Sequence, residues 1–276
     1  MFYHIPDFLA LTGSQLYGYA SPESDYDVIG FVLPPPEYVL GLENFNHHTN
    51  NKGTEEGYVA GKPCDCAVYS LNYFFHLLLN NDTRCLEALF APDNKILKNS
   101  HYGETLIKNR DLFISKKLYK RFAGYAFGEY KKFMGGNGGQ HPLGEKRRAD
   151  IVKYGYSVKN AGQCLRLLMQ GIDILNTGEL KFPLSDDRIQ LIKKVRHGEL
   201  STDAVETKYF LLMRELDEAY DKCTLQAKPN YDKINELLIE MNMRKYINMS
   251  QSRIDGENMT KRFFRGRRYK SAVIGV

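Results

Sequence analysis

The sequence lacks long apolar runs: no segment approaches the ~18 uninterrupted apolar residues that a membrane-spanning helix requires. The N-terminal stretch MFYHIPDFLALTG also lacks the basic start and the apolar core of a signal peptide. Both absences argue against the membrane and secreted classes of protein. We therefore expect a cytoplasmic protein that has no membrane partner.

Cysteine is scarce and follows no metal-binding pattern. The chain has five cysteines with no CxxC spacing, at positions 64, 66, 85, 164 and 223. An odd number without that spacing indicates neither a disulfide framework nor a zinc ribbon, so we expect free thiols. Cys64 and Cys66 flank Asp65 in the run CDCAVY, and on a strand they would face away from it. We interpret them as core thiols rather than metal ligands.

A Walker-type phosphate site is also missing. Residues 134–148 read MGGNGGQHPLGEKRR, with four glycines in five positions but no GKS or GKT after them. Glycine at this density cannot hold a helix at reasonable cost, so we expect a mobile loop. This loop serves either as a plain linker or as a lid that closes over a substrate.

The composition is that of an ordinary globular protein, with 43% hydrophobic and 26% charged residues in 276 positions. Such a chain can form one large domain or two modest ones. The runs FLALTG and DYDVIGFVL, bounded by turn-forming residues, predict strands, and CDCAVY predicts another. The polar stretch of residues 44–61 between them is expected to be a hairpin or a surface loop. We therefore expect strands and turns over the first 70 residues.

Helical patterns dominate the rest of the chain. Apolar residues recur there at intervals of three and four positions. Ser70 is the expected N-cap of the first helix, and Gly178 lies where the C′ residue of a later helix belongs. The expected helices cover residues 71–81, 82–91, 104–134, 148–177, 186–197, 202–226 and 231–246. The predicted fold class is α+β, a small mixed sheet with helices followed by a helical C-terminal region.

The segment TGSQLYGYASPESDYDVIGFVL carries the candidate site. A strand ends at Thr12 and runs into Gly13-Ser14, after which a short helix can start. Glycine lets the backbone approach a phosphate closely, and free amides, the helix dipole and the Ser14 hydroxyl favour the anion. A Gly-Ser pair alone is not evidence of such a site. The interpretation depends on the acids further along the segment.

Three carboxylates come after this turn. Asp25 and Asp27 lie two positions apart at the start of an expected strand and therefore project from one face. Two like charges so placed repel unless a cation lies between them, and magnesium is the natural partner, with manganese as the alternative. Asp65 lies in an otherwise apolar strand, where a buried charge would need a partner. Two ions held by these acids would support phosphoryl transfer, with Asp65 on the nucleophile side or acting as base.

These motifs resemble the DNA polymerase beta nucleotidyltransferase superfamily, in which a glycine-serine turn is followed by a pair of acids. The chain is more specifically similar to predicted nucleotidyltransferases that include RNA-ligase-associated members in bacteria and phages. The similarity extends over three stretches and a trailing RHGELS: GSQLYGYASPESDYDVIGF, CDCAVYSLNYFFHLLLNNDTRCLEALF and VKYGYSVKNAGQCLRLLMQGIDILNTGEL.

The resemblance implies roles for particular residues. It implies that Gly13 and Ser14 contact the triphosphate and that Lys159 and Arg166 contact the nucleotide. It also implies a catalytic, metal-binding set formed by Asp25, Asp27 and Asp65. The implied organisation is a catalytic domain over residues 1–100, a helical domain over residues 101–250 and a basic tail over residues 251–276.

Positions on the expected helices bear on these roles. Asn160 stands where we expect a histidine in many relatives. Lys153, Lys159 and Arg166 are expected near a common face of one long helix, either as a solvated cationic face or as a phosphate-binding one. Arg84 and Glu87 are three positions apart and are expected to form a helix pair.

Basic residues cluster despite a net charge of only +5. One cluster is formed by residues 146–148. The other, the tail segment KRFFRGRRYK, mixes six cations with three aromatics, a composition suited to binding nucleic acid, although it could also be a solubilising end. The predicted nucleic-acid-binding residues are Lys261, Arg262, Arg265, Arg267, Arg268 and Lys270.

Three functions remain open at this point. The first is transfer of a nucleoside monophosphate from an NTP to an RNA 3′ end, with tRNA as one candidate, in RNA repair. The second is nucleotidylation of a protein or small molecule, which needs the same acids but no basic tail. The third is a catalytically silent RNA-binding protein, against which the presence of all three acids argues. The sequence does not give the NTP, the acceptor, the number of nucleotides added or the oligomeric state.

Overall fold

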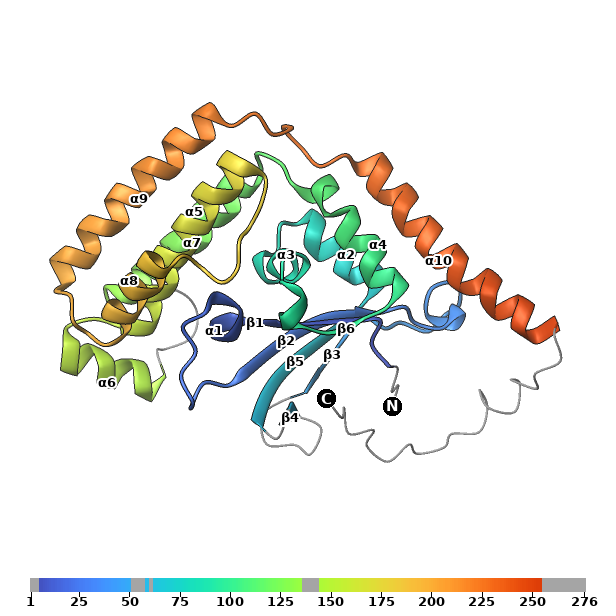
Figure 1. Cartoon of the computed structure of the whole chain (residues 1–276), viewed down its shortest axis with the longest axis horizontal. Helices are drawn as coiled ribbons and strands as arrows, with labels where there is room; N and C mark the ends of the chain where they lie inside the picture. Colours follow the sequence, from blue (N-terminus) through green and yellow to red (C-terminus); the bar gives the residue numbers. More distant parts are fainter. Residues whose placement is uncertain (1–4, 51–57, 60–61, 136–143, 255–276) are drawn as a thin grey trace.

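The computed structural model describes residues 5–50, 58–59, 62–135 and 144–254, and its described part contains one mixed sheet (Figure 1). The strands lie in the order β3-β5-β2-β1-β6, with β4 pairing β5. β2 and β5 are parallel, whereas the other pairs are antiparallel. The strands are β1 (Phe8–Thr12), β2 (Tyr26–Val32), β3 (His47–Asn50), β4 (Tyr58–Val59), β5 (Lys62–Ser70) and β6 (Ile96–Asn99).

Helices cover one face of this sheet and continue into a helical region beside it (Figure 1). The five-residue α1 follows β1 directly, and α2, α3 and α4 lie above the sheet. The helices are α1 (Gly13–Tyr17), α2 (Leu71–Leu79), α3 (Thr83–Leu89), α4 (His101–Lys108), α5 (Leu118–Phe133), α6 (Glu145–Tyr154), α7 (Val158–Thr177), α8 (Asp186–Arg196), α9 (Thr202–Lys222) and α10 (Tyr231–Ile254). The short 3-10 helices are η1 (Pro36–Tyr38), η2 (Asp93–Lys95) and η3 (Arg110–Phe113). This arrangement confirms the α+β prediction.

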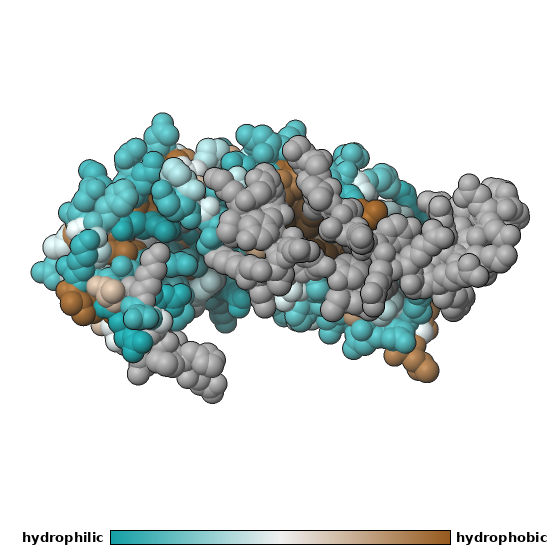
Figure 2. Space-filling model, turned by 90° about the horizontal axis from the view of Figure 1, so that it is seen from below, coloured by the Kyte–Doolittle hydropathy of each residue, from teal (hydrophilic) through white to brown (hydrophobic). Residues whose placement is uncertain are grey.

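Alternation along the strands separates two apolar layers. Phe8, Ala10 and Ile29 face the helices and belong to the main core. Leu9 and Val28 point to the other face, in a smaller buried cluster. Viewed from below, the described surface is mainly hydrophilic, with apolar residues near its middle (Figure 2). The helix-covered face is therefore the one on which the main core is built.

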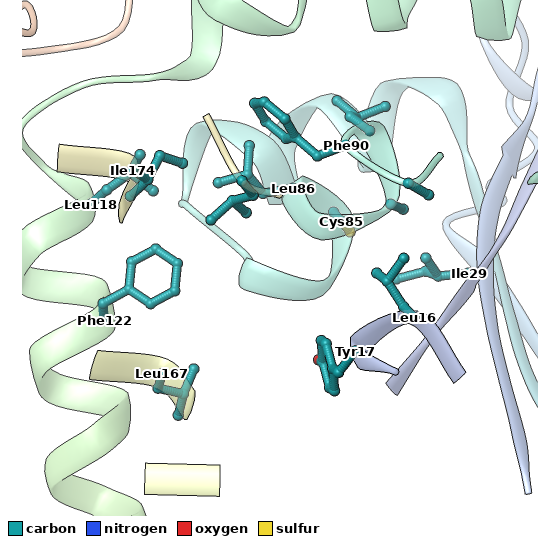
Figure 3. Close-up of a cluster of buried hydrophobic side chains, with 14 of the residues drawn as sticks. Leu16, Tyr17, Ile29, Cys85, Leu86, Phe90, Leu118, Phe122, Leu167 and Ile174 are labelled. Atoms are coloured by element: carbon teal, nitrogen blue, oxygen red, sulfur yellow. The ribbon is translucent and has the colours of Figure 1, made fainter. Parts of the chain in front are cut away.

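The main core joins the sheet to the helical region. Figure 3 shows Leu16 of α1 and Ile29 of β2 beside Cys85 of α3, with Phe122 of α5 and Leu167 of α7 on the far side of α3. All of these residues belong to one contiguous buried cluster. The predicted domain boundary near residue 100 falls between β6 and α4, and the core crosses it through α3.

Several helix ends follow the expected signals. The Ser70 hydroxyl accepts a hydrogen bond of 3.2 Å from the Tyr73 amide, as an N-cap does. Gly178 ends α7 in the left-handed conformation at φ 73°. Asp82, which was not predicted as a cap, begins α3 by accepting from the amides of Arg84 and Cys85, at 3.1 Å each.

Two predicted helices are wrong in their extent. The span 148–177 is divided because Gly155 adopts φ +81° and ends α6 three residues before α7 begins. Lys153 therefore does not share a helix with Lys159 and Arg166. The span 104–134 is divided into α4, η3 and α5. Strand β6 was not predicted, because ILKN is too short to show an alternating pattern.

Candidate active site

The turn that follows β1 lies against Asp27. Thr12 is the register partner of Asp27 on β2, and its hydroxyl donates to the Asp27 carbonyl oxygen at 3.3 Å. Gly13 has φ +63°, and a Cβ built on it would lie 2.1 Å from Oδ2 of Asp27. Only glycine fits both the left-handed backbone and this close approach. The first part of the predicted site is thus a glycine turn closed over a carboxylate.

Asp27 and Asp65 are direct register partners on the parallel strands β2 and β5. Partners in adjacent strands project from the same face of the sheet, and this is the face that carries Thr12 and, further along, the main core. Asp25 lies one residue before β2 begins. The fold therefore brings Gly13, Asp27 and Asp65 to one edge of the sheet, with Asp25 on the approach to it.

Asp65 is exposed, whereas Asp25 and Asp27 are half-buried. The expectation that burial of the Asp65 charge would require a metal is therefore wrong, because the Asp65 side chain reaches solvent. An exposed carboxylate beside a half-buried one can instead face an incoming substrate. Its place in the site rests on register with Asp27, not on burial.

The acids supply the right donor atoms for a hard cation. Among the described residues, no three His, Cys, Asp or Glu side chains form a ready-made metal cluster. Magnesium, however, is usually held by one or two carboxylates together with substrate phosphate oxygens and water. The pair Asp27 and Asp65, with Asp25 nearby in sequence, fits this mode of binding.

The cysteines beside Asp65 lie on the other face, as predicted. Cys64 is buried in the smaller apolar cluster with Leu9 and Val28, and Cys66 packs against this cluster. A hydrogen bond to Cys66 and burial raise the pKa of the Cys64 thiol. The described cysteines are all free thiols. Cys64 and Cys66 therefore belong to the core behind the site.

Ser14 is half-buried in the first turn of α1, where its carbonyl oxygen accepts from the Gly18 amide at 3.2 Å. Gly18 then ends the helix at φ 89°. The apolar side chains of Leu16 and Tyr17 anchor this short helix in the main core. Such anchoring matters because five residues do not form a stable helix by themselves.

Arg166 lies in a buried network behind α1. Its side chain is 3% exposed, and Nη1 donates to Oε1 of Glu87 at 2.8 Å. The Tyr17 hydroxyl donates to the other Glu87 oxygen at 2.7 Å, and the guanidinium lies 4.2 Å from the Tyr17 ring centre. Arg166 also donates to Gln170. The network ties α1, α3 and α7 together, and Arg84 pairs with Asp82 instead of the expected Glu87.

Within the network the pKa values of Tyr17 and Arg166 are both raised, which keeps the tyrosine protonated and the guanidinium charged. Burial raises the pKa of Tyr17, with a further contribution from the Glu87 carboxylate. For Arg166, burial lowers the pKa, but the neighbouring Tyr17, Glu87, Tyr19 and Tyr125 together raise it above its ordinary value, so the guanidinium stays charged. The described contacts of Arg166 are therefore intramolecular. They place it one layer behind the Gly13-Ser14 turn and do not present it as an exposed phosphate ligand.

Lys159 is exposed near the start of α7, whereas Lys153 is exposed on α6. Asn160 is buried: its amide donates to Glu129 at 2.6 Å, and its oxygen accepts from Ser157 at 2.6 Å. The position expected to carry a histidine thus bonds α7 to α5. Of the three cations, Lys159 is the one on α7 whose side chain reaches solvent.

Some predicted features lie outside the described residues. These are residues 136–143 of the glycine-rich segment and residues 255–276 of the tail, including Lys261, Arg262, Arg265, Arg267, Arg268 and Lys270. The linker, lid and nucleic-acid-binding predictions for them stay predictions. Among the described helices, none is long and apolar enough to cross a membrane.

Sequence reasoning missed the network residue Tyr17 and assigned Glu87 another partner. The available signal was weak: Glu87 is an acid among apolar residues in CLEALF, which indicates a buried charge in need of a partner. Which cation meets it depends on the packing of α7 against α3. Glu87 and Arg166 are 79 positions apart in the sequence, which is too far for a local pattern to link them.

Comparison with known proteins gives a consistent family. The model of the RNA repair pathway DNA polymerase beta family matches residues 7–240. An uncharacterized protein of Methanocaldococcus jannaschii, MJ0002, is 30% identical over 247 residues, covering 83% of this chain and 90% of its own length. An uncharacterized 38.9 kDa protein of Enterobacteria phage T4, from the nrdC-mobD intergenic region, is 30% identical over 129 residues. This match covers 44% of the chain and 36% of the phage protein.

A solved structure gives a distant likeness. It is a nucleotidyltransferase-like protein from Exiguobacterium sibiricum 255-15, aligned over 79% of this chain and 69% of its own at 12% identity, with a TM-score of 0.27. The family model matches residues 7–240, a range that includes the glycine turn, all three acids and the network around Arg166. The chain therefore belongs to the RNA repair pathway DNA polymerase beta family of nucleotidyltransferases.

Proposed function

We propose that this protein transfers a nucleoside monophosphate from an NTP to the 3′ end of an RNA. The observation that carries the proposal is the meeting of Gly13, Asp27 and Asp65 at one edge of the sheet. A glycine turn gives phosphates close access to the backbone, and adjacent carboxylates hold the cations that accompany a triphosphate. The family description, RNA repair, supports an RNA acceptor over a protein or small molecule.

In the proposed reaction the α-phosphate of the NTP is attacked by the acceptor hydroxyl, and pyrophosphate leaves. Gly13 and Ser14 contact the triphosphate. Asp25, Asp27 and Asp65 hold two magnesium ions, or manganese as the alternative. Bound ions supply charge neutralisation at the phosphates and a lowered pKa of the attacking hydroxyl. The chain itself orients the reactants in line, which lowers the barrier through positioning.

Lys159 is proposed to contact the nucleotide, because its exposed side chain is at the start of α7. For Arg166 we propose an indirect contribution, through the buried pair with Glu87 that supports α1. The basic residues 261–270 are proposed to bind RNA phosphates. If they do, removal of residues 261–276 weakens RNA binding and reduces its dependence on salt.

Incubation with NTPs labelled at the α-phosphate, magnesium and either an RNA pool or total protein tests the function. Label on RNA that disappears in the Asp25→Ala, Asp27→Ala variant supports the proposal. Label on protein instead supports the alternative, nucleotidylation of a protein. Absence of label on either acceptor, together with absence of NTP binding, would contradict an enzymatic role.

A further inference from the structure

A cationic cleft lies between α3 and α5. It has a volume of about 400 Å³, and its lining residues are Asp82, Thr83, Arg84, Lys120, Arg121, Gly124 and Tyr125. Three of these residues are cations and one is an acid. The cations come from two helices: Arg84 from α3, and Lys120 and Arg121 from α5. Positive charge from separate elements therefore converges on one hollow of the surface.

The acid in the cleft offsets only part of this charge, because one carboxylate stands against three cations. The Asp82 carboxylate accepts from the amides of Arg84 and Cys85, and so is used to cap α3. It also lies 3.9 Å from Nε of Arg84 and 3.8 Å from an Nη of Arg121, while its own side chain is only 14% exposed. Asp82 thus forms an ion pair with each arginine. Their side chains remain 59% and 45% exposed, available to a ligand.

Glycine leaves the wall of the cleft open. Gly124 lies in the middle of α5, where glycine costs about 1 kcal/mol relative to alanine. A Cβ built on it would meet no heavy atom within 4 Å, so packing does not require glycine there. The missing side chain gives a ligand access to the helix surface between Arg121 and Tyr125.

Strand β5 connects the neighbourhood of the cleft with the candidate active site. Burial raises the pKa of Tyr69, a residue of β5, and the Arg84 charge opposes this rise. Tyr69 shares its sheet face with Asp65, about 13 Å away along the strand at a rise of 3.3 Å per residue. On the other wall, the Tyr125 hydroxyl accepts from Gln163 of α7 at 3.3 Å. The cleft therefore lies within electrostatic reach of β5, the strand that carries Asp65, but is built from other residues than the carboxylate site.

We propose that this cleft binds the backbone phosphates of the single-stranded RNA acceptor, upstream of its reactive 3′ end. An open hollow with exposed, flexible cations suits a phosphodiester strand, because such contacts are electrostatic and independent of sequence. An NTP would instead be held at the Gly13 turn. The inference rests on the proposed function for the identity of the acceptor.

The test measures binding of a fluorescent single-stranded RNA by anisotropy at several salt concentrations. The cleft variant is Arg84→Ala, Lys120→Ala, Arg121→Ala. Its control removes three exposed cations from the ion pairs of α9 and α10, as Arg214→Ala, Lys222→Ala, Arg244→Ala. We expect the cleft variant to weaken RNA binding at least tenfold and to lose about 0.7 of the salt slope per phosphate contact. The control should bind RNA nearly as the unaltered protein does.

A second pair of variants tests the shape of the cleft and leaves its charge unchanged. Gly124→Leu fills the cleft, whereas Gly128→Leu adds the same side chain to α5 at a position that does not line the cleft and is equally open. We expect Gly124→Leu alone to weaken RNA binding and to raise the KM for RNA without changing the KM for the NTP. A rise in the NTP KM would assign the cleft to the triphosphate and overturn the proposal. Equal RNA binding by both leucine variants, or by both triple variants, would also overturn it.

The measurement of RNA binding does not depend on catalysis. If the unaltered protein binds RNA through the cleft but transfers no nucleotide, the proposed function fails while the cleft assignment stands. If it transfers nucleotide to RNA without loss of binding in the cleft variant, the cleft assignment fails while the function stands. These two failures are therefore distinguished by the same set of proteins.

Discussion

The backbone of Gly13 approaches Asp27 so closely that a Cβ atom at position 13 would lie 2.1 Å from the Asp27 carboxylate oxygen Oδ2. This contact joins the two motifs that the sequence shows separately, the glycine turn after β1 and the acid on β2. It also explains why their spacing matters: the antiparallel pairing of Thr12 with Asp27 sets the carboxylate over the turn. The glycine turn and the Asp27 carboxylate are thus held together by the pairing of β1 with β2.

Replacing Gly13 with alanine should therefore damage the site more than the fold. The substitution forces an L side chain into φ +63° and displaces the Asp27 carboxylate. We expect nucleotidyl transfer to fall at least tenfold. Left-handed backbone alone costs about 1–2 kcal/mol. Gly135→Ala is the matched control, because Gly135 has φ +77° but nothing within 4 Å of its Cβ. Thermal unfolding should show similar losses of stability for Gly13→Ala and Gly135→Ala. Transfer rates should fall only for Gly13→Ala.

The pair formed by Glu87 and Arg166 should be a large determinant of stability. Glu87→Ala leaves a guanidinium that is 3% exposed without its carboxylate. Breaking one side of a buried ion pair typically costs about 3–5 kcal/mol. Urea denaturation would measure this loss. The double variant Glu87→Met, Arg166→Met should recover much of it, because both charges are removed together.

The control for that experiment is Glu218, an exposed acid in ion pairs with two cations. Glu218 lies 3.9 Å from Arg214 and 3.8 Å from Lys222, and all three side chains are at least 55% exposed. Glu218→Ala should cost no more than about 1 kcal/mol. Equal costs for Glu87→Ala and Glu218→Ala would show that the buried network does not support α1.

Alkaline pH should destabilise the helical region through its tyrosines. Hydrogen bonds to Glu206 and to Asp217 raise the pKa values of Tyr130 and Tyr119 to about 12 from 10.0. The folded state then keeps these protons after the unfolded state has lost them. Their contribution to stability is complete below pH 10 and is lost as the pH rises toward 12. Melting temperatures measured over this range should fall.

Phenylalanine variants identify the groups responsible. Tyr119→Phe, Tyr130→Phe should be less stable at neutral pH but should lose less stability between pH 10 and 12. Tyr231→Phe, which changes a tyrosine that is 63% exposed, should leave the pH dependence unchanged. An unchanged slope in the double variant would mean that neither hydrogen bond is maintained in solution.

The sequence predicts the parts of the fold that depend on local patterns. Alternating apolar runs located β1, β2 and β5, and the capping residue Ser70 located the start of α2. The division of one predicted helix into α6 and α7 was missed, because a single glycine with positive φ at Gly155 interrupts an otherwise continuous helical pattern. Periodicity alone does not reveal which glycine adopts that conformation.

The candidate site was likewise predictable only where it depends on local spacing. Spacing along the chain predicted correctly that Cys64 faces away from Asp65. That Asp25 and Asp27 project together stays a prediction, because Asp25 precedes β2. The exposure of Asp65 was not predictable, because it depends on how other elements cover this face of β5. The buried pairing of Arg166 with Glu87 was not predictable either, because it forms only when α7 packs against α3.

The most direct test of the central claim is single-turnover transfer of the labelled α-phosphate of an NTP to RNA by Asp27→Asn and Asp65→Asn. The control is Asp221→Asn, an exposed acid on α9. The site predicts that both register partners are required, with transfer reduced at least about 100-fold in each variant and abolished in the unaltered protein by a magnesium chelator. Asp221→Asn should transfer at the unaltered rate. Transfer by Asp27→Asn and Asp65→Asn at that same rate would contradict the account.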